Sequence, residues 1–291
     1  MLRLVLPKGS LERATLELFA AADLTVHRSS EVDYSARIDD PRVSEVRILR
    51  PQEIPTYLEE GLFDLGITGR DWVEETGADV VSLGELGYSK ASDQPIRIVL
   101  AVADHSPVEK VEDLPASCRV ATEYPNLTRR FLAGRGIEAD VRYSHGATEA
   151  KVPDIADAVV ELTETGRALR AAGLRIVETL FVSHTELVAS RQSADDPDKA
   201  RAMRQLMVLL EGALEARGKV LVKLNVSSAD LDQVIGVLPS MKAPTVSKLF
   251  GEEAFAVETV VLKREINVLI PALKERGASD ILELDLSKIV H

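Results

Sequence analysis

The chain contains 291 residues, of which 45% are hydrophobic, and carries a formal net charge of −12 at pH 7. This length predicts two or three domains with buried cores, and the composition argues against extensive disorder. The acidic balance excludes a general nucleic-acid surface, which requires a basic footprint. An anionic ligand must therefore be held by local cations, backbone N–H groups or a metal ion.

Cys118 is the only cysteine, which excludes an intrachain disulfide and a cysteine-based zinc cluster. Its place in the strand-like sequence CRVAT favours a small core residue over a nucleophile. The N-terminal sequence MLRLVLPKGSLERATL is charged early and has no long apolar run, so it predicts neither an export signal nor a membrane helix. We expect a cytoplasmic protein with no membrane partner.

Strand-like and helix-like segments alternate from the N-terminus onward, a pattern that favours an α/β architecture. Ser10 is expected to cap the first helix, and Pro51 is expected in the first turn of the second, where a missing N–H costs little. The predicted strands are LRLVL (2–6), EVRIL (45–49), DLGIT (64–68) and VVSLGEL near residue 82, and a third helix is expected after Gly69-Arg70-Asp71.

A second unit follows a loop predicted at residues 89–95. Its predicted helices begin at Val108 and run through LTRRFLAGRG. Two later strands, LRIVETL and TELVAS (185–190), are expected to return toward the first unit. The predicted strands of the second unit are IRIVLAV (96–102), CRVAT (118–122), ADVRYS (139–144) and the apolar run 156–162.

The strongest helix prediction is DDPDKARAMRQLMVLLEGALEARG, because its apolar residues from Met203 to Leu214 repeat at the i, i+3, i+4 spacing and Gly218 ends it. Residues 219–291 then follow the order β-α-β-β-α-β, which is typical of a ferredoxin-like fold. Many small domains of this order bind amino acids, but the fold alone does not establish that function.

The sequence DIADAVVELTETGRALRAAGL (154–174) contains the candidate phosphate site. Thr163 to Gly166 lie where a predicted strand ends and a helix begins, so backbone N–H groups and the helix dipole can favour an anion. Threonine hydroxyls can donate to phosphate, while carboxylates suit ribose hydroxyls or Mg²⁺. The sequence also fits an ordinary turn in which Thr165 caps the helix, and the nucleotide signatures GxGxxG and GxxxxGK[ST] are absent.

Several motifs resemble one family, the ATP phosphoribosyltransferases, which perform the first step of histidine biosynthesis. The resemblance lies in LVLPKGSL, LRPQEIPTYLEEGLFDLGITGRDWV, RVATEYPNLTRRFLAGRGI and GATEAKVPD followed by ADAVVELTETGRALRAAGL. LPSMKAPTVSKLF and RGASDILELDLSKIV resemble the regulatory domain of the long form, so nearly the whole chain is covered. The sequence departs from the family at Glu161, usually Asp, at Ala168, usually Thr, and at Asp154, usually Gly, with one residue fewer after Glu149.

The resemblance implies a two-lobed, periplasmic-binding-protein-like α/β core and a C-terminal ferredoxin-like (ACT-like) regulatory domain. Lobe I would comprise residues 1–92 and 180–217, lobe II residues 93–179 with the phosphate loop, and the regulatory domain residues 218–291. It also implies a glycosyltransferase that joins ATP to 5-phosphoribosyl 1-pyrophosphate (PRPP), releasing pyrophosphate, with Mg²⁺ as cofactor. Alignment and charge stabilisation are the main requirements, and no general base is identified.

The resemblance also implies the substrate-binding residues. Asp157, Glu161 and Lys8 would be catalytic, with Asp157 and Glu161 also near Mg²⁺. The set for PRPP is Glu149, Asp157, Glu164, Thr165, Gly166 and Arg167, and the set for ATP is Lys8, Gly9, Arg13, Gly69, Arg70, Asp71 and Tyr124. Structural alternatives remain open: Lys8 and Arg13 as surface charges, Asp71 as a helix cap, and Tyr124 as a core residue.

For the C-terminal domain the resemblance implies an allosteric histidine site, feedback inhibition and a homo-oligomer, expected to be a hexamer built from dimers. The predicted effector residues are Asn225, Met241, Thr245 and Asp280, which offer an amide, a thioether, a hydroxyl and a carboxylate. The alternative is that they are turn and cap residues of a small domain.

Two other functions also fit parts of the sequence. NLTRRF (126–131) resembles an element of prephenate dehydratases, although it lies far upstream of the regulatory domain. A cytoplasmic amino-acid or solute sensor would also use two lobes with a chain crossing between them. Pyrophosphate release, phenylpyruvate release and binding without turnover distinguish the three.

Overall fold

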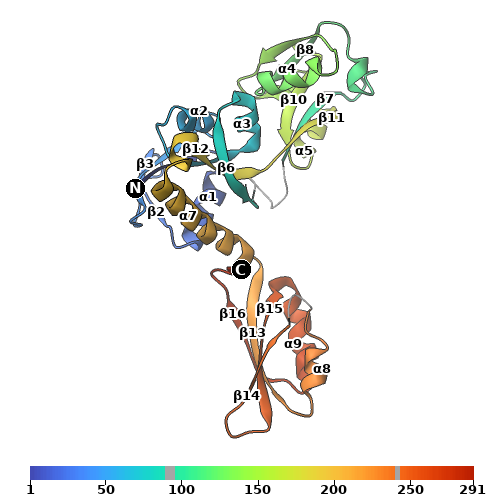
Figure 1. Ribbon diagram of the computed structural model, residues 1–291. Helices are drawn as coiled ribbons and strands as arrows, with labels where there is room; N and C mark the ends of the chain where they lie inside the picture. The colour runs from blue at the N-terminus through green and yellow to red at the C-terminus, as the bar shows by residue number, and fades with distance from the viewer. Residues whose placement is uncertain (89–95, 240–242) are drawn as a thin grey trace. The chain divides into compact units, whose positions relative to one another are not determined.

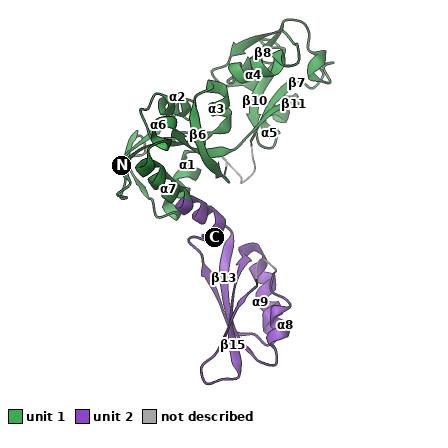
Figure 2. Cartoon of the chain, in the orientation of Figure 1, with its two compact units in different colours: residues 1–207 green, residues 208–291 purple. Residues whose placement is uncertain are grey.

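The computed structural model describes residues 1–88, 96–239 and 243–291. It contains two compact units, residues 1–207 and 208–291 (Figure 2). The unit boundary falls inside helix α7 (Pro197–Ala216), whereas the sequence placed the start of the C-terminal domain at residue 218. The loop predicted at residues 89–95 lies outside the described residues.

Lobe I of the first unit is built on a seven-stranded sheet in the order β2-β3-β4-β1-β5-β12-β6. Strands β4, β1 and β5 are parallel neighbours, so their carboxyl ends share one edge of the sheet. The strands are β1 (Leu2–Pro7), β2 (Val26–His27), β3 (Ser35–Ile38), β4 (Val43–Leu49), β5 (Leu65–Gly69), β6 (Val80–Leu86) and β12 (Thr185–Ser190). The helices are α1 (Glu12–Ala21), α2 (Ile54–Glu59), α3 (Arg70–Thr76) and α6 (Arg191–Ala194).

Lobe II is built on a five-stranded sheet in the order β11-β7-β10-β8-β9 (Figure 1). Strands β10, β8 and β9 are parallel, while β7 is antiparallel to β10 and to β11. The strands are β7 (Ile96–Ala103), β8 (Cys118–Thr122), β9 (Ala139–Tyr143), β10 (Ala158–Thr163) and β11 (Leu174–Ser183). The helices are η1 (Val111–Asp113), α4 (Pro125–Ala133), η2 (Thr148–Lys151) and α5 (Arg167–Ala171).

The return of the chain from β11 to β12 brings the carboxyl edges of the two sheets to one connection. In lobe II, Ser183 at the end of β11 pairs with Ile96, next to the pairing of Thr163 with Arg97 at the end of β10. In lobe I, Thr185 at the start of β12 pairs with Gly69 at the end of β5. Both edges where parallel strands end therefore border residues 183–185.

The second unit confirms the predicted β-α-β-β-α-β order. Its sheet has the order β14-β15-β13-β16, and α8 and α9 cover one face (Figure 1). Alternate residues of β13, from Val220 to Val226, are buried and pack in one cluster with residues of both helices. The elements are β13 (Lys219–Ser227), α8 (Leu231–Ile235), β14 (Thr245–Lys248), β15 (Ala254–Leu262), η3 (Lys263–Glu265), α9 (Ile266–Glu275) and β16 (Ser279–Asp285).

Three local predictions need correction. Ser10 does not cap α1, because Leu11 occupies the N-cap position and its side chain makes no capping hydrogen bond. The helix expected from Val108 is only the short η1, since Pro107 and Pro115 enclose a segment too short to sustain an α-helix. Strands β2 and β3 were not predicted. By contrast, Cys118 is buried in the lobe II core, as expected.

Asp64 joins the base of lobe I to the first turns that follow β12. Its carboxylate is 1% exposed and accepts hydrogen bonds from the Arg3 backbone N–H at 2.7 Å, the Ser193 hydroxyl at 2.7 Å and the Lys199 ammonium at 2.8 Å. Burial alone would raise the pKa of Asp64, but these donors outweigh it and hold the pKa well below its usual range. The ionised carboxylate therefore ties β1, α6 and α7 to β5.

Replacing Asp64 with Asn should destabilise the protein by about 2–3 kcal/mol, because two cations lose a buried counter-charge. Since the folded pKa of Asp64 is lowered, this stabilisation is present above pH 3.8 and is lost as the pH falls through the folded pKa. Urea unfolding at pH 7 and at acidic pH measures both effects. Arg191→Gln, which breaks an exposed pair with Asp79, is the control and should cost much less. Equal losses in the two variants would contradict the anchoring role of Asp64.

Candidate active site

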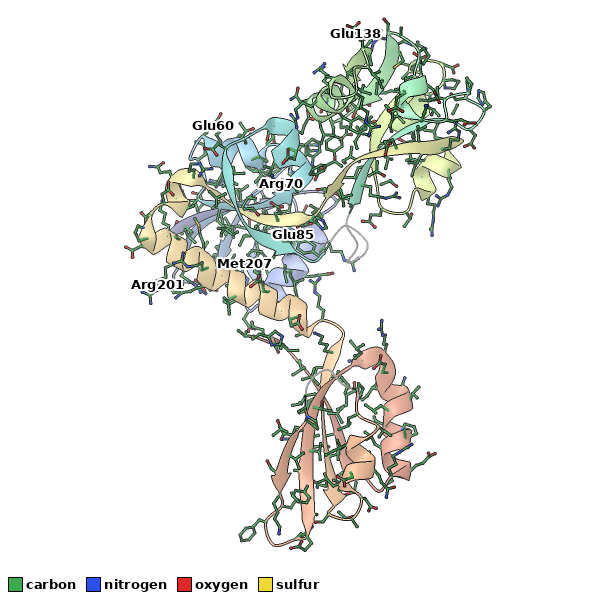
Figure 3. The ribbon with its side chains drawn as sticks, turned by 45° about the vertical axis from the view of Figure 1, so that its right-hand side comes forward. Glu60, Arg70, Glu85, Glu138, Arg201 and Met207 are labelled. Atoms are coloured by element: carbon green, nitrogen blue, oxygen red, sulfur yellow. The ribbon has the colours of Figure 1, made fainter. Side chains whose placement is uncertain are left out.

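Three basic residues follow three adjacent parallel strands of lobe I. Lys8 follows β1, Arg50 follows β4, and Arg70 follows β5. Arg70 lies in the first turn of α3 (Figure 3). The Lys8 backbone N–H donates to the Leu49 carbonyl at 2.6 Å, so the Lys8 and Arg50 positions lie side by side. Ligands of open α/β sheets bind at such carboxyl ends. This edge is therefore a candidate site for a polyanion.

Arg50 was not among the predicted site residues. A local signal was nevertheless present, because a basic residue directly follows the predicted strand EVRIL, just as Lys8 follows LRLVL with one proline between them. The sequence alone does not show that these two strands, β1 and β4, lie side by side in the sheet.

The other predicted residues of this edge differ in their surroundings. The Lys8 ammonium lies 3.9 Å from the Tyr34 ring centroid, and Gly9 has a φ of +89°, a conformation that favours glycine. Arg13 is highly exposed and pairs with Glu17 one turn along α1, at 2.8 Å. Arg13 therefore has the environment of a surface charge, while Lys8 belongs to the edge.

Arg70 is engaged by carboxylates of its own lobe. Its guanidinium donates to Glu74 at 2.6 and 3.0 Å, and it lies 3.7 Å from the nearly buried Glu186. Two carboxylates neutralise its charge, so Lys8 and Arg50 are the better candidates for holding phosphate groups.

In lobe II the predicted phosphate loop forms a tight turn between β10 and α5. Gly166 has a φ of +72°, and a Cβ there would lie 2.8 Å from the Arg170 guanidinium. The Gly166 N–H donates to the Thr163 hydroxyl at 2.8 Å, so this amide is already used within the turn. Thr165 and Arg167 are exposed beside it. The turn can thus offer a hydroxyl and a guanidinium to an anion.

Carboxylates lie close to this turn. Burial is the main cause of the raised pKa of Glu161, and the negative charges of Glu123 and Glu149 raise this pKa further. Hydrogen bonds from the Leu162 N–H and the Thr148 hydroxyl lower it in part. Among the described residues, no three His, Cys, Asp or Glu side chains are grouped closely enough to hold a metal ion by themselves. A metal here would need additional oxygen ligands from phosphate or water.

Asp157 lies away from the turn, and its predicted role at PRPP and Mg²⁺ stays a prediction. It precedes β10, whereas the turn follows β10, and six strand residues span roughly 20 Å. Its carboxylate is bound by Arg119, with the guanidinium Nη2 at 2.7 Å and the backbone N–H at 2.8 Å. The hydrogen bonds from Arg119 hold the pKa of Asp157 below its usual range.

Asp71 and Tyr124 are buried and bonded to each other, and their predicted contact with ATP stays a prediction. Asp71 is 1% exposed and Tyr124 is 2% exposed, and the Tyr124 hydroxyl donates to Asp71 at 2.8 Å. Gly69 makes room for this arrangement, because a Cβ at that position would lie 2.1 Å from the Asp71 carboxylate. All three residues therefore serve the protein interior.

In the second unit the predicted effector residues are only partly brought together. The Asn225 amide donates to the Asp280 carboxylate at 3.0 Å. Thr245 instead lines a cavity of about 400 Å³ with charged residues that include Lys219, Glu258 and His291. Met241 lies outside the described residues.

These features define a class of protein: a two-lobed α/β protein with anion-binding groups at the carboxyl ends of its strands, followed by a ferredoxin-like domain. In the described parts of the chain, no helix combines the length and apolarity needed to cross a membrane. Comparison with known proteins identifies the family.

The family model for ATP phosphoribosyltransferase matches residues 50–212, and the model for the HisG C-terminal domain matches residues 216–288. The chain belongs to the ATP phosphoribosyltransferase family, in its long form, and is thus a pentosyltransferase. The ATP phosphoribosyltransferase of Desulforudis audaxviator is 48% identical over 289 residues, covering 99% of both chains. That of Chlorobium phaeovibrioides is 46% identical, covering 100% of this chain and 98% of the relative.

A solved structure supports the catalytic fold. The Thermotoga maritima ATP phosphoribosyl transferase (HisG:HisZ) complex contains a chain with a TM-score of 0.62 and 25% identity, which covers 72% of this chain and 99% of the other. The family assignment leaves no support for the prephenate dehydratase and solute-sensor alternatives.

Whether Asp157 acts at PRPP can be tested. Asp157→Asn should cost about 1 kcal/mol of stability, because the pair with Arg119 is bidentate but partly exposed. The KM for PRPP should stay within about twofold of wild type, since the side chain is far from the turn. Steady-state kinetics and thermal unfolding measure the two quantities. A tenfold rise in this KM would restore Asp157 to the binding site.

Proposed function

We propose that the protein transfers the phosphoribosyl group of PRPP to N1 of the adenine of ATP, as the first step of histidine biosynthesis. The main support is that the carboxyl edges of both sheets border the same connection, residues 183–185. Lys8 and Arg50 lie on the edge of lobe I, and Thr165 and Arg167 lie on the edge of lobe II. Two phosphorylated substrates can meet there, one on each edge. The family assignment supports ATP and PRPP as those substrates.

The proposed chemistry is a displacement at C1 of the ribose. The N1 lone pair forms the new bond as the C1–oxygen bond breaks, and the bonding electrons leave with pyrophosphate. Thr165 and Arg167 hold the 5′-phosphate by charge-assisted hydrogen bonds, and Lys8 and Arg50 stabilise negative charge on the polyphosphate groups. Alignment supplies much of the rate, because the ring nitrogen is already nucleophilic.

Magnesium is part of the proposal. The carboxylate of Glu161 and its neighbour Glu149 are oxygen ligands of the kind that Mg²⁺ accepts, and Mg²⁺ commonly combines one or two carboxylates with substrate phosphates. When bound, it would supply charge neutralisation and orientation of the pyrophosphate. The departure at Glu161 keeps this donor type with a side chain one methylene longer than Asp.

The C-terminal domain is proposed to bind histidine and inhibit the enzyme. Support comes from the long-form match over residues 216–288 and from the Asn225–Asp280 pair, which offers a carboxylate to an amino group. The homo-oligomer, a hexamer built from dimers, is part of the same proposal, and sedimentation velocity with and without histidine tests it.

The first test is the reaction itself with ATP, PRPP and Mg²⁺. Wild type should form phosphoribosyl-ATP and pyrophosphate. Thr165→Val should raise the KM for PRPP by about tenfold or more, because a hydrogen bond to a charged group contributes about 1.5–3 kcal/mol. Thr165→Ser, which keeps the hydroxyl, is the matched control and should remain near wild type. No product from wild type would refute the function, and equal kinetics of Val and Ser variants would refute the role of Thr165.

The effector proposal has a separate test. Asp280 has a φ of +49°, which Asn tolerates, so Asp280→Asn removes the charge while preserving the backbone. Histidine should inhibit this variant about tenfold more weakly, with kcat unchanged, since a charge-assisted bond is lost. Lys248→Gln, which breaks an exposed pair between β14 and Glu253 at the opposite edge of the same sheet, is the control. Unaltered inhibition in Asp280→Asn would place the histidine site elsewhere.

A further inference from the structure

Helix α3 belongs to lobe I but contributes a side chain to the core of lobe II. Trp72 is 9% exposed and forms part of the hydrophobic cluster that also contains Ile98, Val120 and Tyr124. Its ring stacks on Tyr124, with centroids 4.5 Å apart and an interplanar angle of 27°. Such a stacked aromatic pair stabilises the contact beyond the effect of the apolar area that it buries.

Asp71, the residue before Trp72, forms hydrogen bonds both to lobe II and to the connection at residues 183–185. One carboxylate oxygen accepts the Ser183 hydroxyl at 2.6 Å, and the other accepts the Tyr124 hydroxyl at 2.8 Å. The Asp71 N–H also donates to Ser183 at 2.9 Å, and the three residues are between 0% and 2% exposed. A group this deeply buried requires all of its partners, because leaving one unsatisfied is costly.

Glu75, one turn further, occupies the N-terminus of α4 in lobe II. Its carboxylate accepts the backbone N–H of Asn126 at 2.9 Å and that of Leu127 at 2.8 Å, and the Asn126 amide donates back to the Glu75 carbonyl at 3.1 Å. Burial raises the pKa of Glu75, and the two N–H donors oppose this. A carboxylate at a helix N-terminus also gains from the helix dipole.

We propose that α3 is an interlobe clamp and that Asp71 and Glu75 are positioning residues for the transfer reaction. Through Tyr124, Ser183 and the first turn of α4, they hold the β5 edge of lobe I against the β8 edge of lobe II. The two substrate-binding edges then keep one separation and orientation while each binds its own substrate. This inference rests on the proposed function, because only a two-substrate reaction needs that alignment.

The clamp predicts a particular kinetic signature. Loosening it leaves Thr165 and Arg167 intact within lobe II, so PRPP should bind as before. Alignment of the adenine with C1 should suffer, and displacements near 1 Å can cost on the order of a hundredfold in rate. A residue that only stabilised the fold would lower the melting temperature without separating kcat from binding.

The test uses two full-length variants with matched controls. Tyr124→Phe removes only the hydroxyl that Asp71 accepts and keeps the ring on Trp72. Its control is Tyr57→Phe, which removes an exposed hydroxyl bond to Glu53 inside lobe I. Glu75→Gln replaces one carboxylate oxygen, which accepts an N–H of α4, with an amide NH₂ group that can only donate. Its control is Glu178→Gln, which breaks an exposed pair with Arg135 inside lobe II.

Three measurements decide the outcome: kcat, the Kd for PRPP by calorimetry, and amide hydrogen exchange. Tyr124→Phe and Glu75→Gln should lower kcat about tenfold with a PRPP Kd within twofold of wild type. The Asn126 and Leu127 amides should exchange faster, and both controls should match wild type. Variants that match their controls in kcat and exchange would overturn the clamp.

Failure of the proposed function gives a different result. Wild type would then form no phosphoribosyl-ATP, while hydrogen exchange in Tyr124→Phe and Glu75→Gln would still report whether α3 holds α4. Slower turnover with unchanged exchange in α4 would also count against the clamp, because it would place the effect in the substrate site.

Discussion

The site depends on how β12 returns to lobe I and inserts between β5 and β6. Because β12 is antiparallel to β5, it begins where β5 ends. Because β10 and β11 are both antiparallel to β7, they end at the same edge of the lobe II sheet. This pairing makes the carboxyl edges of two separate sheets border a single short connection. Without it, the cations after β1 and β4 and the turn after β10 would not border the same connection.

The distribution of charge follows from the same arrangement. A chain with a net charge of −12 can bind polyanions only if its acidic groups are neutralised or kept away from the binding edges. Asp64 is held by Arg3 and Lys199 at the amino end of β5, and Asp157 by Arg119 at the amino end of β10. Lys8 and Arg50 lie at the carboxyl ends of the parallel strands β1 and β4.

Local patterns predicted much of the fold and only part of the site. Strand and helix periodicity located most elements, and the motifs identified the family, because both depend on neighbouring residues. The family resemblance implied one site for Asp157 and Glu161, yet β10 separates Asp157 from the turn. Asp71 is bound by Tyr124 and Ser183, which lie 53 and 112 residues further along the chain, and a single sequence cannot pair residues so far apart. Arg50 was missed because sheet order, not sequence, makes it a neighbour of Lys8.

The place of Trp72 has a practical consequence. It is the only tryptophan in the chain, and its indole is stacked on Tyr124 within the core of the opposite lobe. The intrinsic fluorescence of the protein therefore arises at the joint between the lobes, with no background from elsewhere in the chain except tyrosine. Emission wavelength and quenching by acrylamide can follow this joint in solution without attaching a label.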